Sequence, residues 1–111
     1  MFTVQLNAFV QEPSTRRALA AERTVELPCA PIAGLTIILS DIVHFEIARV
    51  DYDIRDNSWS AECEDEIITP PLVSLEQCEQ WYREAGFSIE LHNLDDSPAR
   101  RRPRHLRPVP S

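Results

Sequence analysis

The chain alternates apolar and polar residues along several short stretches, and this period of two constrains its fold more than any other feature. In the first stretch, residues 2–10, every second side chain is apolar. These apolar residues are Phe2, Val4, Leu6, Ala8 and Val10. Successive side chains of a strand point to opposite faces of the sheet, so this alternation is typical of a half-buried strand. Residues 2–10 are therefore predicted to form a strand with one face on the core.

The following residues are predicted to form a loop and a second strand. Residues 11–20 combine a proline with polar neighbours, which indicates a loop with one helical turn near 17–21. Residues 23–29 alternate again and predict a strand. Its inward-facing residues would be Val25, Leu27 and Cys29. The prolines that follow end this strand or place it at a sheet edge, because proline cannot donate to a ladder.

A three-stranded meander is predicted next. Its strands would cover residues 35–39, 43–55 and 58–66. A three-residue turn at 40–42 sets Ile37 opposite Phe45, and every inward pair of this hairpin is then apolar. After Ile47 the apolar phase shifts by one residue, which predicts a β-bulge at Ala48–Arg49 that curls the sheet.

The last hairpin of the meander is predicted to turn at Asp56–Asn57, because both residues tolerate a positive φ. This register places Arg49 opposite Glu64, a favourable pair. It also places Asp51 opposite Glu62, a like-charge pair that costs several tenths of a kcal/mol. Either water screens this repulsion, or a cation or an arginine side chain offsets it.

One helix is predicted after the meander. Ser74 and Gln77 match a capping box, and an apolar stripe follows at helical spacing. Gly86 ends the helix, and Phe87 can pack back on Tyr82 as in a Schellman closure. A short strand with an alternating apolar face completes the predicted domain.

These elements predict an α+β fold. Residues 1–96 would form one domain, a small curled antiparallel sheet of five to six strands covered by one C-terminal helix. The curl favours a roll or a partial barrel. Residues 97–111 combine prolines with five arginines and are predicted to be a disordered basic tail.

Charge is divided along the chain, whose formal net charge is −7. Residues 1–96 hold 18 acidic and 6 basic side chains, a net −12, and residues 97–111 add five arginines and no acid. An acidic body repels nucleic-acid phosphates, so direct nucleic-acid binding is not expected outside the Arg100–Arg107 segment. The two parts are therefore expected either to bind different partners or to bind each other.

The motifs of several enzyme and cofactor classes are missing. The chain holds only two glycines and no Gly-x-Gly-x-x-Gly, Walker or Gly-x-Ser-x-Gly sequence, so a nucleotide cofactor is not expected. Cysteine and histidine show no paired zinc spacing, so neither a metal site nor another cofactor is predicted. The sequence favours a non-enzymatic protein.

Location and source are indicated only in outline. The longest uncharged stretch, Leu27–Ser40, is too short for a membrane helix, and no signal sequence is recognised. Three widely spaced cysteines favour free thiols in a reducing cytoplasm. Cys63 and Cys78 are predicted to be core residues, and Cys29 is the thiol most accessible to reagents. Arginine as the sole strongly basic residue type suggests a bacterial or phage source.

Three functional hypotheses follow. The first is an interaction module that binds a basic protein surface through the acidic face of the meander, at Asp51, Asp53, Glu62 and Glu64. A sharper form of it is an inhibitor that mimics nucleic acid and blocks a DNA- or RNA-binding protein.

The second hypothesis is a small-ligand or enzymatic site near the bulge and the helix. Its candidate residues are His44, Tyr52, Cys63 and His92. The third hypothesis is a homo-oligomer with a structural role.

Overall fold

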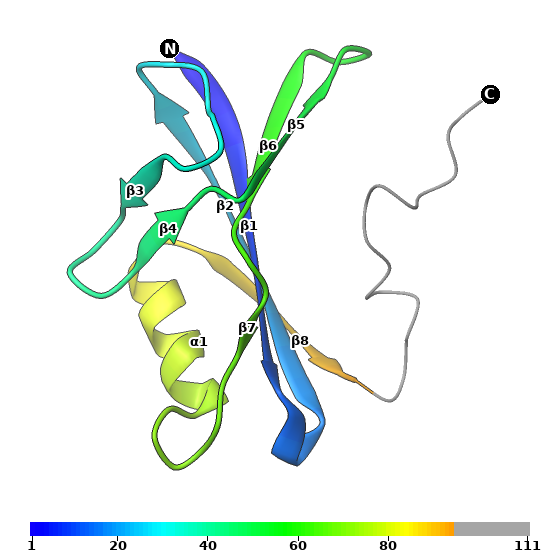
Figure 1. The fold of residues 1–111 in the computed structure, drawn as a ribbon, viewed down its shortest axis with the longest axis vertical. Helices are drawn as coiled ribbons and strands as arrows, with labels where there is room; N and C mark the ends of the chain where they lie inside the picture. Colours follow the sequence, from blue (N-terminus) through cyan, green and yellow to red (C-terminus); the bar gives the residue numbers. More distant parts are fainter. Residues whose placement is uncertain (95–111) are drawn as a thin grey trace.

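The computed structural model describes residues 1–94, which form an α+β fold around a mixed sheet (Figure 1). Two eleven-residue strands, β1 (Phe2–Glu12) and β2 (Arg17–Leu27), form its central hairpin. The 3-10 turn Pro13–Thr15 joins them. The later elements are β3 (Thr36–Ile38), β4 (His44–Glu46), β5 (Arg49–Asp53), β6 (Ser58–Glu62), β7 (Glu66–Ile67), α1 (Leu75–Glu84) and β8 (Ser88–Asn93). The predicted basic tail, 97–111, lies outside the described residues.

The main sheet has the strand order β5-β6-β1-β2-β8, and β7 also pairs with β1. β1 pairs with β6 and β7 in parallel and with β2 in antiparallel orientation, so the prediction of an antiparallel sheet is wrong. The parallel pairing follows from the long connection between β2 and β6, which lets the chain return beside β1 in the same direction. The sheet remains open and does not close into a barrel.

The predicted alternation of β1 is confirmed, because Val4, Leu6, Ala8 and Val10 are all buried. β2 begins earlier than predicted, and residues 17–21 are strand and not a helical turn. The full ladder with β1 outweighs the helix propensity of this alanine-rich segment. β2 also ends before Cys29, which is exposed and does not face inward as predicted.

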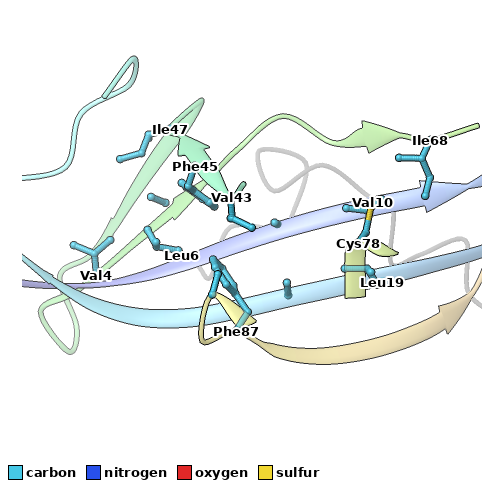
Figure 2. Packing of buried hydrophobic residues seen from close by; sticks show 14 of the residues in the cluster. Val4, Leu6, Val10, Leu19, Val43, Phe45, Ile47, Ile68, Cys78 and Phe87 are labelled. Atoms are coloured by element: carbon cyan, nitrogen blue, oxygen red, sulfur yellow. The ribbon is translucent and has the colours of Figure 1, made fainter. Parts of the chain in front are cut away.

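Two separate elements cover the same face of the main sheet (Figure 1). The β3–β4 hairpin covers one half, where Phe45 and Ile47 lie near Val4 and Leu6 (Figure 2). Helix α1 covers the other half, where its Cys78 lies beside the β1 and β2 side chains. No element of residues 1–94 covers the opposite face (Figure 1).

The predicted meander is divided between two sheets. The β3–β4 register is as predicted, with Ile37 opposite Phe45, but this hairpin forms a sheet of its own. The Ile47 amide donates to Leu35 in that hairpin, and the next amide, of Ala48, donates to Glu62 of β6. The shift in apolar phase after Ile47 therefore marks a change of sheet, and the prediction of one bulged strand over 43–55 is wrong.

The β5–β6 hairpin closes with a longer turn than predicted. Residues 54–57 form the turn, and Tyr52 lies opposite Trp59, two residues away from the predicted register. The backbone amide of Arg55 donates to Asp53 at 3.0 Å, and the Tyr52 hydroxyl donates to Asn57 at 2.5 Å. These local contacts favour the longer turn. A shift of two residues leaves the side chains of β5 and β6 on their predicted faces. Ile54, which was expected to face inward, lies in the turn and is exposed, so that prediction is wrong.

Helix α1 begins and ends with the predicted caps. The Ser74 hydroxyl accepts from the Gln77 amide at 3.2 Å, and Gln77 accepts from the Ser74 amide at 3.0 Å. At the other end Gly86 has a φ of 90°, and the Phe87 amide donates to the Tyr82 carbonyl at 2.9 Å. The rings of Tyr82 and Phe87 meet edge to face at 5.1 Å between centroids, which completes the Schellman closure.

A buried carboxylate lies at the start of this helix, and no local pattern in the sequence indicates it. Glu12 is 1% exposed, and its Oε2 accepts from the Leu75 amide at 2.7 Å. Its Oε1 accepts from the Thr15 hydroxyl at 2.6 Å and from Arg17 at 3.0 Å. The Thr15 hydrogen bond, together with those from Leu75 and Arg17, outweighs desolvation and lowers the pKa of Glu12 below its ordinary value.

Cationic side chains of β2 hold both ends of the helix. Arg17 bridges Glu12 to Glu76 in the first helical turn, at 2.8 Å from Glu76. Arg23 donates to the Ala85 carbonyl at 2.5 Å, where the helix ends. A carboxylate at the N-terminus and a guanidinium at the C-terminus both match the helix dipole. The β1–β2 hairpin therefore fixes the position of α1 along the sheet.

The substitution Glu12→Gln tests this anchor. Removing the charge weakens three hydrogen bonds in a buried place, and we expect a loss of about 2 kcal/mol in unfolding free energy. Urea denaturation monitored by circular dichroism gives this value. Glu76→Gln, at the exposed partner of Arg17, is the matched control and should cost far less, because water screens that ion pair. An equal loss in both variants would contradict the anchoring role.

The lowered pKa of Glu12 also predicts a dependence of stability on pH. A carboxylate whose pKa is depressed on folding stabilises the fold fully above its unfolded pKa, and this stabilisation is lost as pH falls through the folded pKa. Unfolding free energy should therefore decrease more steeply below pH about 4.3 in the wild-type chain than in Glu12→Gln. Parallel curves for the two chains would show that Glu12 contributes nothing to acid lability.

Candidate functional site

The uncovered side of the main sheet is the candidate functional site, and we call it the open face. Directly paired residues share a face, so the register defines its members. They are the odd-numbered residues of β1 and β5 and the even-numbered residues of β2, β6 and β8. Each strand of the path β5-β6-β1-β2-β8 therefore contributes side chains to it.

Carboxylates predominate on the open face. At strand positions within residues 1–94 it carries six carboxylates, one arginine, Arg49, and one histidine, His92. The six are Glu22, Glu26, Asp51, Asp53, Glu62 and Glu90. Uncharged polar residues of β1 lie between them, and Gln5 donates to Asn7 and to Glu22, each at 3.0 Å. The face is therefore polar and negatively charged over most of its width.

Arg49 offsets the repulsion that the sequence predicted between Asp51 and Glu62. In the observed register Arg49 lies opposite Glu62. The predictions of a direct Asp51–Glu62 pair and of an Arg49–Glu64 pair are therefore wrong. The Arg49 Nη2 atom lies 3.1 Å from Glu62 and 3.5 Å from Asp51. One guanidinium thus lies between two carboxylates on one face. Of the explanations considered from the sequence, the structure matches the one in which an arginine side chain offsets the repulsion.

The four predicted partner-binding residues do not all share the open face. Asp51, Asp53 and Glu62 lie on it, and Asp53 binds Arg55 through both carboxylate oxygens, at 3.0 and 2.8 Å. This hydrogen-bonded pairing raises the pKa of Arg55. Glu64 is exposed in the connection after β6 and belongs to no strand.

The four residues of the predicted ligand site are dispersed. His44 lies on β4 of the small sheet, and Tyr52 and His92 lie on β5 and β8 at opposite edges of the main sheet. Four strand spacings, about 19 Å, separate those edges. Cys63 is half-buried beyond the end of β6. These side chains therefore do not converge on one pocket.

His92 instead belongs to an aromatic contact on the open face. Its ring stacks on Phe9 with 6.4 Å between centroids, and its Nε2 atom lies 3.0 Å from Glu90. Phe9 projects from β1 and His92 from β8, on either side of β2. The open face thus has an apolar, aromatic part beside its acidic part.

One hollow of about 270 Å³ lies at the β2–β8 side of the molecule. Its lining is mostly polar: Gln5, Glu22, Arg23, Thr24, Gly86 and Ser88. Small-molecule pockets are usually enclosed and largely apolar, and this hollow is open to solvent. The geometry here is that of a surface depression.

Sequence reasoning missed Glu22, Glu26 and Glu90 as members of the face. Glu26 lies within the predicted strand 23–29, whose position in the sheet the sequence does not indicate. Glu22 lies between the predicted helical turn near 17–21 and that strand. The alignment of β8 beside β2 adds Glu90, and no local pattern in the sequence indicates that pairing.

Other classes of site are not found in the described part of the chain. Residues 1–94 contain no group of three histidine, cysteine or acidic side chains placed to hold a metal ion. The ten-residue α1 lacks the length and apolar character needed to cross a membrane, and residues 1–94 contain no other α-helix. Comparison with protein-family models, curated proteins and solved structures finds no match to this chain.

Thiol reactivity tests how the cysteines are placed. Burial raises the pKa of both Cys63 and Cys78 to about 11, whereas Cys29 is exposed. We expect one thiol per chain to react rapidly with a disulfide reagent at pH about 8, and mass spectrometry should locate it at Cys29. All three should react in denaturant. Rapid reaction of all three thiols in the native chain would contradict the described packing.

Proposed function

We propose that the protein is a non-enzymatic interaction module whose open face binds a basic surface of a partner protein. The observation that carries the proposal is the open face itself. It is five strands wide, no described element covers it, and its strand positions hold six carboxylates against one arginine.

The accessibility of these carboxylates supports binding over acid–base catalysis. The side chains of Asp51, Asp53 and Glu62 are 42%, 37% and 28% exposed, and they project from a sheet surface. A catalytic acid needs a desolvated carboxyl with a raised pKa beside the substrate. Solvated carboxylates on a broad face instead attract a cationic partner over a long range.

The size of the face indicates what kind of complex to expect. Five strands at about 4.8 Å spacing and roughly eight residues of length give an area on the order of 500 Å². A standard protein–protein interface buries about 800 Å² per partner. The complex should therefore be of modest affinity and strongly weakened by salt, because exposed charges provide much of its attraction.

Charge substitutions on the open face test the proposal. The variant Asp51→Asn/Asp53→Asn/Glu62→Gln removes three of its negative charges. We expect it to bind a ten-residue peptide with five arginines at least tenfold more weakly at about 50 mM salt, because fewer carboxylates meet the guanidinium groups. Isothermal titration calorimetry measures the affinity.

A matched control removes the same charge elsewhere. Asp41→Asn/Glu46→Gln/Glu84→Gln alters three exposed carboxylates on the small sheet and the helix. This control should bind the peptide within about twofold of the wild-type chain, since only long-range screening changes. Equal weakening in both triple variants would show that the attraction follows net charge and not the open face.

A further inference from the structure

We propose that the arginine-rich segment of this same chain, residues 97–111, folds back over the open face and competes there with the basic partner. The competition rests on the proposed function, whereas the contact of the segment with the face does not. The segment is the regulatory occupant of the site, and it must be displaced before a partner binds.

Charge complementarity identifies this occupant. Residues 97–111 hold five arginines and no acidic residue. The open face holds six carboxylates and one arginine at its strand positions. Arginine presents a planar fork of donors that matches a carboxylate, so the charge and the geometry of the segment both suit this face.

The described residues end at Leu94, beside the open face, and this position also favours residues 97–111 as the occupant. β8 is an edge strand of the main sheet, and its Glu90 and His92 lie on the open face. The ladder continues to Leu94, whose amide donates to the Arg16 carbonyl at 2.9 Å. The segment therefore begins beside the open face, at the edge farthest from β5.

The segment is long enough to cross the face. Asp51 lies about 19 Å across the sheet from β8 and about 27 Å along it from Leu94, or about 33 Å diagonally. Arg104 is ten residues beyond Leu94 and Arg107 is thirteen, which correspond to about 33 and 43 Å of extended chain. Arg100–Arg102 can meet the nearer carboxylates while the later arginines reach β5.

Tethering makes a weak contact effective. A short linker holds its ligand at an effective concentration of about 1 mM or above, so even a millimolar affinity gives substantial occupancy. A partner that competes with the tethered segment then binds with an apparent association constant equal to its intrinsic constant multiplied by the fraction of open faces that are free. Salt should release the segment, because the same screening acts on every arginine contact.

The contact can be detected in the full-length chain by nuclear magnetic resonance. A nitroxide is attached at Ser111→Cys in a Cys29→Ser background, and the side-chain amides are observed. At low salt we expect broadening of Gln5, Asn7 and Gln11 on the open face and none of Gln77 and Gln80 on α1. Changing all five tail arginines to glutamine should abolish the broadening, and changing them to lysine should preserve most of it. No broadening, or equal broadening of the helix amides, would overturn the proposal.

The arginine peptide separates this inference from the proposed function. If the segment occupies the face, the chain with five Arg→Gln changes should bind the peptide at least threefold more tightly than the wild-type chain, because its face is free. Equal affinity in the two chains would overturn the regulatory role. Broadening on the open face without peptide binding by either chain would support the fold-back contact and refute the partner-binding function.

Discussion

The β1–β2 hairpin is the element on which the rest of the structure depends. Eleven consecutive residue pairs join its strands, and β1 also pairs with β6 and β7 on its other side. The apolar face of β1 contacts both covering elements, with Leu6 near the β3–β4 hairpin and Val10 near α1 (Figure 2). Burial of this one strand face therefore organises two layers that are far apart in sequence.

The hairpin also accounts for the asymmetry of the sheet. Glu12 and Arg23 hold the two ends of α1 against the face that carries the apolar residues. Both covers are consequently confined to one side, and the opposite side remains a broad polar surface among the described residues. Because a packed core supports this face from behind, we expect little entropy to be lost on binding the partner that we propose.

Local patterns predicted the parts of the fold that local physics determines. The alternation of β1, the pairing of Ile37 with Phe45 and the Ser74 cap all depend on neighbouring residues, and all are confirmed. The parallel pairing of β6 with β1 and the role of Glu12 depend on contacts between distant residues, which periodicity does not reveal. The acidic face was predicted from part of β5 and β6, whereas its β2 and β8 members required the long-range strand order.

We propose above all that the uncovered sheet face is the surface that receives positive charge. Carbodiimide labelling of carboxylates, followed by mass spectrometry with and without the arginine peptide, tests it residue by residue. We expect Glu12 to resist labelling throughout, and Glu22, Asp51 and Glu62 to lose reactivity when the peptide is added. Protection of Asp41 and Glu46 on the small sheet, with none on the open face, would contradict the claim.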